Sequence, residues 1–306
     1  MDDCRMAVKP RNVSAAEWDA LNERFYRMSP HSYLEQRLRS LVLTISDDTD
    51  TGQLWDEGVG YRAIKISGQE SAGREGIDRY AALESTVLLH HASESLLRLY
   101  LAHEYRTMCP WEALSAMTSF RDVKARLTDL QGQLDDDARL DDLMEVFVYT
   151  PDSSKFPGVS AEQWAGHRNA LRLVLGAALE EVLGHAHIYN AAKHGLALLA
   201  GEVGMSLGEV DNDPVISQSG PALTYLERAP DWQITTTWVQ PERNIALTVL
   251  VMDQLRNLWN VAQTHRLRAA PQTFNPLTVE AVEQALHYGF TPGFNVQTMS
   301  EKLATE

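Results

Sequence analysis

The sequence is short of cysteine, of long apolar runs and of positive charge, and each shortage excludes a class of protein. Its two cysteines among 306 residues make neither a disulfide framework nor a zinc site, so we expect a reducing compartment. The N-terminus lacks the basic start and apolar core of a secretory signal. No uninterrupted apolar run approaches the length of a membrane span. We therefore expect a cytoplasmic protein that does not enter a membrane.

Acidic residues outnumber basic ones by 42 to 27, which gives a formal net charge of −15. This balance favours solubility and disfavours a broad basic surface for non-specific binding of nucleic acid. Any contact with phosphate groups would have to be local, at a place where cations outweigh the acidic surface. The length allows a full hydrophobic core, in one large domain or in two modest ones.

Apolar residues at helical spacing run through most of the chain and predict a mainly α protein. Two short helices lead the chain, and a capping box marks the start of each, Ser14 with Glu17 and Ser32 with Glu35. Further helices are expected over residues 77–106 and 110–130, after Asp137, over residues 164–201 with a break near Gly184, from Pro241 onward, and over residues 275–287.

The expected fold class is an up-and-down helical bundle of four or five long helices with a small β-hairpin insertion. The hairpin is predicted near residues 222–239, where two alternating stretches flank a turn sequence. A short strand is expected over residues 59–66, a loop over residues 201–214, and a frayed tail over the last dozen residues. On this division, residues 1–72 hold the N-terminal helical pair, and residues 73–306 form the bundle.

The polar stretch at residues 185–195 is the feature that most resembles a functional site. At 100° per residue, His187, Asn190 and His194 fall on one side of a helix, with Lys193 at the edge of that side. Tyr189 falls on the other side with apolar residues. Two histidines, a lysine and a carboxamide grouped in this way are more typical of a site than of a solvated face.

A second group of polar residues lies on the predicted helix 77–106. Glu84, His90, His91, Glu94 and Arg98 share one side of that helix, and two of the pairs among them have i, i+4 spacing. We interpret this side as a solvated face with ordinary ion pairs. The alternative interpretation is that it meets the polar stretch at residues 185–195 across the bundle.

The segment YNAAKHG at residues 189–195 resembles the signature of the HEPN superfamily. Those proteins are small helical bundles, and many are metal-independent RNases of toxin and antiviral systems. The family pattern is an arginine, a polar residue, three further residues and a histidine. Asn190 and His194 match it, whereas Tyr189 stands at the position of the arginine that contacts the scissile phosphate. The fragment from Arg98 to His103 has the looser arginine-x4-histidine spacing.

The resemblance implies RNA as the partner, a homodimer with the site at its interface, and cleavage without a metal or another cofactor. His194 would act as base or acid, since histidine titrates near neutrality. Lys193 would hold the phosphate, and Asn190 would position the histidine. Binding residues would come from the same stretch and from the facing helix: His187, Tyr189, Arg98, His91 and Glu94.

Two other functions remain open from the sequence. The first is a catalytically inactive HEPN-like module that dimerises or binds a protein partner through the same face. The second is a metal-dependent helical enzyme that uses His90, His91 and His194. Spacing disfavours the metal, because the Glu-x-x-His motifs of di-iron bundles do not occur, and His187 lies about two helical turns from His194.

Overall fold

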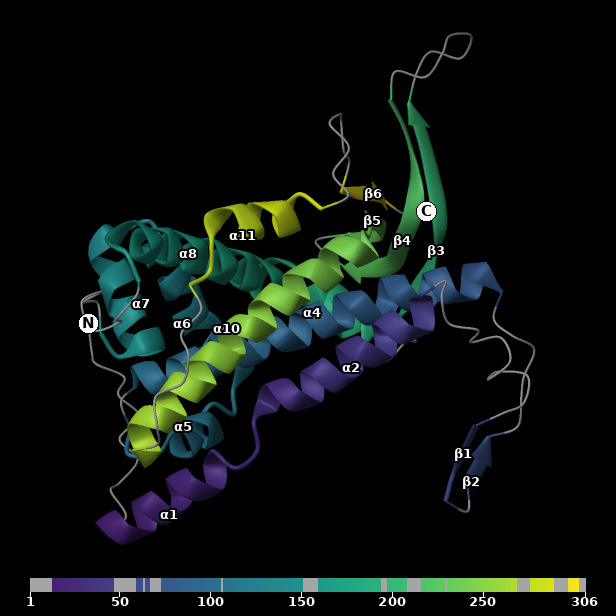
Figure 1. Cartoon of the computed structure of the whole chain (residues 1–306). Helices are drawn as coiled ribbons and strands as arrows, with labels where there is room; N and C mark the ends of the chain where they lie inside the picture. The colour runs from purple at the N-terminus through teal and green to yellow at the C-terminus, as the bar shows by residue number, and fades with distance from the viewer. Residues whose placement is uncertain are drawn as a thin grey trace.

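The computed structural model describes residues 13–46, 59–62, 64–66, 73–105, 107–150, 159–193, 197–207, 216–228, 231–268, 276–288 and 297–302 (Figure 1). Helices predominate among these residues, which confirms the predicted mainly α class. The candidate catalytic residue His194 lies outside the described residues.

The elements follow one another along the chain in three blocks: helices, a sheet, and two closing helices with a last strand. The helices are α1 (Ala15–Phe25), α2 (Pro30–Ile45), α4 (Arg74–Glu104), α5 (Pro110–Ala116), α6 (Phe120–Gln133), α7 (Asp137–Val148), α8 (Ala161–Gly184), α9 (Ala186–Ala192), α10 (Pro241–Leu267) and α11 (Val279–Leu286). The strands are β1 (Val59–Tyr61), β2 (Ile64–Ile66), β3 (Leu198–Leu207), β4 (Ile216–Arg228), β5 (Trp232–Trp238) and β6 (Thr298–Lys302). None of these described helices is long and apolar enough to cross a membrane.

Helix α4 is the centre of the fold. Residues 85–90 are all buried, which an amphipathic surface helix does not allow, so this helix is covered on several sides. Helices α2, α8 and α10 all pack against it (Figure 1). Leu34 and Leu41 of α2 belong to the same buried cluster as Leu96 of α4 and Leu255 of α10. The N-terminal helical pair therefore shares its core with the later helices.

Helices α4 and α10 lie side by side and run in the same direction. The Asn244 amide, near the beginning of α10, donates over 3.3 Å to Oγ1 of Thr86 in the first half of α4. Near the end of α10, Arg266 donates to the carbonyl oxygens of Thr107 and Met108, which follow the end of α4. Two neighbouring long helices with the same direction depart from a simple up-and-down alternation. The structure thus supports the helical class but does not confirm the predicted up-and-down bundle.

The starts of the two leading helices test the capping prediction. At α1, Ser14 and Glu17 form the predicted reciprocal box. The second predicted box is wrong, because α2 already begins at Pro30, whose fixed φ suits the first position of a helix. Ser32 and Glu35 therefore lie inside the helix and do not cap it.

The polar stretch does not lie in one long helix. Helix α8 ends at Gly184, as expected from the glycine, and the short helix α9 follows after His185. The prediction of a helix up to residue 201 is wrong, because residues 198–207 form strand β3. That strand makes ten residue pairs with β4. Pairing across the sheet thus overrides the helical spacing of a short apolar run.

The predicted hairpin is part of a larger sheet. Strands β4 and β5 confirm it, and β3 and β6 extend it to a four-stranded antiparallel sheet in the order β3-β4-β5-β6. The predicted loop at 201–214 is therefore wrong up to residue 207, and the predicted frayed tail is wrong where β6 pairs with β5. Residues 59–66 form a separate two-stranded hairpin instead of one strand.

One face of the larger sheet positions α9. Leu198, Leu223 and Tyr225 are buried on this face, in a cluster with Ile188 and Ala192 of α9. The same cluster includes residues from the first half of α4, so α9 is held between α4 and the sheet. This packing decides which side of α9 points inward.

Candidate functional site

Among the described residues, the predicted division of the polar stretch into two sides is right. The alternative interpretation, in which the polar side of this stretch meets the polar side of α4, is wrong. Ile188 and Tyr189 face α4 and the sheet, whereas His187, Asn190 and Lys193 are exposed. The polar side of α9 therefore points to solvent. The stretch does meet α4, but through Tyr189 instead of the predicted polar residues.

The polar side of α4 is not a solvated face. His90 is only 2 % exposed, so the solvated interpretation is wrong for this residue. Its ring stacks on the Tyr189 ring, with the centroids 3.9 Å apart and the planes within 5° of parallel. Its Nδ1 atom lies 3.3 Å from a carboxylate oxygen of Glu181 at the end of α8. His90 thus joins α4 to both α8 and α9.

Glu181 is a buried carboxylate held by two histidines. Its second oxygen lies 3.0 Å from His185 Nδ1, at the break between α8 and α9. Burial by itself raises the pKa of the Glu181 carboxyl, but the hydrogen bonds from His185 and His90 outweigh burial and hold that pKa below its ordinary value. The bond to Glu181 in turn raises the pKa of His185. This group fixes the beginning of α9.

Tyr189 is tied to a guanidinium through His91. The Tyr189 hydroxyl lies 2.7 Å from His91 Nε2, and the Nδ1 atom of the same ring lies 2.7 Å from Arg37 Nη1. Arg37 comes from α2 and also donates to Glu84 over 3.2 and 2.5 Å. The chain of contacts therefore runs from α2 through α4 to α9.

The donors and acceptors along this chain can be assigned from chemistry. A guanidinium group only donates, so Nδ1 of His91 accepts from Arg37. The ring is then neutral, and its proton lies on Nε2 and is donated to the Tyr189 oxygen. Burial, with Arg37 and His90 nearby, lowers the pKa of His91, in agreement with a neutral ring. The hydrogen of the Tyr189 hydroxyl is not used in this chain and can be donated to another acceptor.

Two exposed residues, Asn190 and Lys193, lie near the Tyr189 ring. Lys193 Nζ donates to Asn190 Oδ1 over 2.9 Å, and the same ammonium lies 5.5 Å from the centroid of the Tyr189 ring. We use the name α9 corner for Arg37, His91, Tyr189, Asn190 and Lys193. It combines a phenol, a carboxamide and an ammonium, all of which can donate to an oxyanion.

Three predicted binding residues make their hydrogen bonds outside the α9 corner. One of them, Glu94, still lies near it, because burial and the Glu94 carboxylate together raise the pKa of Tyr189. Glu94 and Arg98 pair with each other over 2.7 Å, and Arg98 also donates to the Met117 carbonyl oxygen before α6. His187 Nε2 lies 2.9 Å from the Tyr225 hydroxyl on the sheet. In these contacts the three residues connect elements of the fold.

Two residues of this region, Arg37 and Glu181, were not predicted from the sequence. Arg37 lies on a different helix, far from the motif in sequence, and no spacing pattern links them. Glu181 lies closer, four residues before His185, an i, i+4 spacing that the sequence does show. Only Glu181 could therefore have been found from the sequence.

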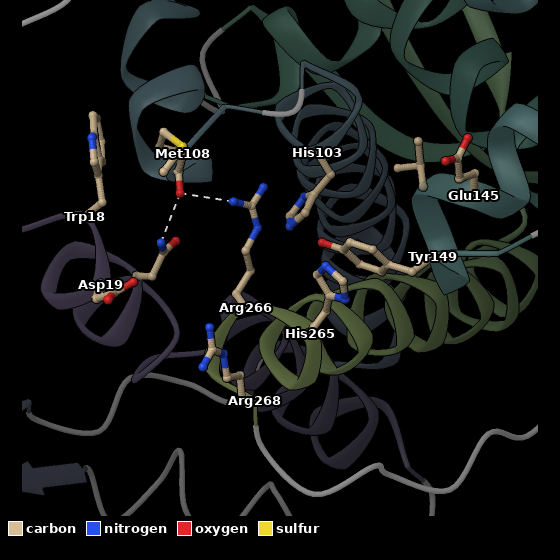
Figure 2. Close-up of a pocket in the computed structure, with 11 residues that line it drawn as sticks. Trp18, Asp19, His103, Met108, Glu145, Tyr149, His265, Arg266 and Arg268 are labelled. Atoms are coloured by element: carbon tan, nitrogen blue, oxygen red, sulfur yellow. Dashed lines mark hydrogen bonds between the residues drawn. The ribbon is translucent and has the colours of Figure 1, made fainter. Parts of the chain in front are cut away.

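The described residues also enclose a cavity of about 630 Å³ at the other end of α4, between α1, α7 and the end of α10. Figure 2 shows Arg266, His265 and Tyr149 around it, with Trp18 and Asp19 at one side and His103 at another. The size is typical of small-molecule pockets.

Several polar groups of this cavity are hydrogen-bonded within the protein, among them those of His103, Asn22 and Arg266. His103 Nδ1 lies 2.7 Å from the carbonyl oxygen of Leu99, one turn earlier, so it donates its proton there. Its Nε2 then accepts from the Tyr26 hydroxyl over 2.9 Å. Burial lowers the pKa of His103 to about 4, and the ring is neutral. Asn22 Oδ1 and Arg266 Nε are buried without a partner, which leaves one acceptor and one donor for a water or a small polar group.

No family model matches the chain, and no curated protein and no solved structure is significantly similar to it. The comparisons assign no family. In the part of the chain that the structure describes, no three His, Cys, Asp or Glu side chains form a group that could hold a metal ion. The function therefore has to be inferred from the α9 corner and from the sequence motif.

Proposed function

We propose that the α9 corner binds RNA through a backbone phosphate and that the protein is a HEPN-like, metal-independent RNase of a stress or defence system. The main observation that supports this site is the direction of the hydrogen bond between His91 and Tyr189. The Tyr189 hydroxyl accepts its hydrogen bond from His91 and keeps its own hydrogen for an outside acceptor. Lys193 and Asn190 are exposed and hydrogen-bonded to each other, and the Lys193 ammonium lies 5.5 Å from the centroid of the Tyr189 ring.

The arrangement offers a substitute for the arginine that the motif lacks. Tyr189 has no charge, but its hydroxyl is a donor, and Lys193 supplies the positive charge next to it. Arg37 adds a guanidinium at the inner end of the chain, where Glu84 already neutralises it. Lys193 is therefore the cation of this corner that is left for a phosphate. Such a local cation is what a chain of net charge −15 needs.

RNA fits this corner better than duplex DNA. A flexible single strand can place one phosphate on an isolated cation, and its unstacked bases can lie on exposed aromatic rings. Tyr33 and Tyr80 are exposed near Arg37: the guanidinium lies 6.0 Å from the Tyr33 ring, and Arg37 acts on the ionisation of Tyr80. A duplex would bring many more phosphates toward an acidic surface.

Cleavage requires a group that moves a proton from the 2′-hydroxyl and another that returns a proton to the leaving oxygen. His194 follows Lys193 directly in the sequence and is the candidate for this transfer. His91 is a poorer candidate, since it is neutral and both ring nitrogens are engaged. The catalytic part of the proposal therefore rests on His194.

The rival function is an inactive module that binds a protein partner through the same corner. The observation in its favour is that Arg37 and both ring nitrogens of His91 already have hydrogen-bond partners within the protein. Such a module would keep the chain of hydrogen bonds and would not bind RNA.

The test is incubation of the purified protein with mixed single-stranded RNA in EDTA, beside a His194→Ala variant. His287→Ala is the matched control, because His287 is an exposed histidine at the end of α11 and outside the motif. The proposal expects cleavage by the wild-type chain and by the control, and none by His194→Ala. Cleavage by all three proteins would place the activity elsewhere.

Binding is measured separately with a fluorescently labelled RNA and a non-cleavable 2′-methoxy version. Lys193→Glu should weaken binding roughly tenfold or more, whereas Lys124→Glu, the same charge change on exposed α6, should weaken it much less. Binding without cleavage would leave an RNA-binding protein that is not an RNase. Absence of binding would favour the partner-binding module.

A further inference from the structure

The four-stranded sheet has one face that the helices do not cover. Paired residues of neighbouring strands point to the same side of a sheet. One side carries Leu198, Leu223 and Tyr225, which are buried against α4 and α9. The other side, the outer sheet face, carries large apolar residues on all four strands: Leu199, Leu226, Trp232, Ile234 and Met299.

These five side chains are between 39 % and 75 % exposed. Isolated exposed apolar residues are ordinary, but a contiguous group on a flat sheet is typical of an interaction surface. The register shows that the group is contiguous, since Leu226 pairs with Ile234, and the next pairs along the strands contain Leu199, Met299 and Trp232. Trp238 lies on the same face, and its indole nitrogen donates to the carbonyl oxygen of Val203 across the intervening strand β4. The outer sheet face therefore presents large apolar side chains on all four strands, with the hydrogen-bonded pair Thr224 and Thr236 between Leu199 and Met299.

The charges of this face point to a second copy of the chain as the occupant. In the described strands, the register places only Arg228 and Glu301 as charged residues on it. The face is therefore neutral, although the whole chain carries −15, so two copies can approach here with the least repulsion. Arg228 lies on β4 and Glu301 on β6, on opposite sides of β5.

A two-fold axis makes these two charges complementary. If the axis lies in the interface along β5, β4 of each copy lies over β6 of the other. Arg228 then approaches Glu301 of the second copy, and the same pair forms again on the other side of the axis. Sheets that pack face to face at a small angle bring their apolar side chains together between them.

We propose that two copies of the protein associate through their outer sheet faces and form a symmetric dimer. The interface is centred on Ile234 and Leu226, with Trp232 beside them and the two Arg228–Glu301 pairs at its edges. It lies on the opposite side of the sheet from α9. The dimer therefore does not depend on RNA binding or on the motif.

The test is sedimentation equilibrium of the full chain across a wide concentration range. Ile234→Lys should raise the dimer dissociation constant roughly tenfold or more, because it buries a charge against an apolar surface. Leu43→Lys is the matched control, since Leu43 is 59 % exposed on α2, away from the sheet. Circular dichroism should show both variants folded, because both side chains are exposed in one copy.

A charge exchange makes the test specific for a second copy. Arg228→Glu and Glu301→Arg should each weaken the dimer, and the combination of both should restore it. A monomeric wild-type chain, a dimer that Ile234→Lys leaves intact, or a double variant no better than the single ones would overturn the proposal. Recovery of the outer sheet face in a complex with a different protein, while the chain alone is monomeric, would also overturn it.

Discussion

Helix α4 carries two histidines that each hydrogen-bond to a tyrosine from another element, and the two pairs differ in the direction of the hydrogen bond. His103 donates from Nδ1 to its own helix, so its Nε2 accepts from Tyr26. His91 accepts from Arg37 at Nδ1, so its Nε2 donates to Tyr189. Tyr26 thus donates its hydroxyl hydrogen to His103, whereas the hydroxyl hydrogen of Tyr189 is not used in the bond to His91. The partner of Nδ1 therefore decides whether Nε2 donates or accepts. Only when Nε2 donates does the tyrosine keep its hydroxyl hydrogen for a ligand.

Burial separates the two pairs further. His103 and Tyr26 lie in the core, where Tyr26 also contacts the rings of Phe25 and Trp259. His91 and Tyr189 are only partly buried, and the other members of the α9 corner on the same helix end, Asn190 and Lys193, are exposed. We therefore expect the first pair to stabilise the fold and the second to contribute mainly to binding.

The largest effect should come from removal of the buried histidine. His103→Ala leaves a cavity and an unpaired Tyr26 hydroxyl, so the free energy of unfolding should fall by about 2–4 kcal/mol. His91→Ala, at a half-buried position, should cost less than about 1 kcal/mol. Urea unfolding followed by circular dichroism measures both. Equal losses would remove the distinction between the two pairs.

The pH dependence of stability should show the contribution of the buried His103. The pKa of His103 is lowered from 6.5 to about 4 in the fold, so on acidification the unfolded chain binds a proton before the folded chain does. Stability is then full above about pH 6.5 and falls as the pH drops toward 4, with a contribution of up to about 3 kcal/mol.

Urea unfolding at a series of pH values tests this dependence. His103→Gln should show a shallower fall in stability than the wild-type chain over this range. His167, whose pKa burial also lowers to about 4, keeps part of the dependence in the variant. An unchanged slope would mean that His103 does not remain neutral in the fold.

A smaller effect should follow from removal of the free donor at the α9 corner. Tyr189→Phe keeps the ring and its stacking on His90 but loses the hydroxyl, so RNA binding should weaken roughly three- to tenfold. Tyr288→Phe, at an exposed tyrosine just after α11, is the matched control. Fluorescence anisotropy with labelled RNA measures the change. Equal effects of the two substitutions would count against a specific role for Tyr189.

The smallest effect concerns the other end of the hydrogen-bond chain. Arg37 lowers the pKa of His91, so Arg37→Gln should raise that pKa by less than about one unit. An NMR titration of the His91 ring reports the change directly. A lower pKa in the variant would contradict the assigned direction of the Arg37–His91 bond.

The sequence predicts the helical class, α4, the start of α1 and the β4–β5 hairpin, because local signals and periodicity determine these elements. It fails at β3 and β6, because their pairing partners lie far away in the chain and residues 198–201 fit either a helix or a strand. For the site, the two sides of α9 were predicted correctly among the described residues, whereas the resemblance to the HEPN motif and the role of His194 stay predictions. The orientation of α9 and the role of Arg37 depend on packing between separate helices, which one sequence does not reveal.

The most direct test of the RNA site is ultraviolet cross-linking of the wild-type chain to single-stranded RNA, followed by mass spectrometry of the peptides. An RNA phosphate at the α9 corner predicts cross-links in the peptide that contains Tyr189 or at exposed Tyr80 or Tyr33 next to Arg37. Lys193→Glu should reduce these cross-links, and Lys124→Glu should not. Cross-links confined to Trp18 or Tyr149 at the distant cavity would contradict the assignment and move the RNA site to the other end of α4.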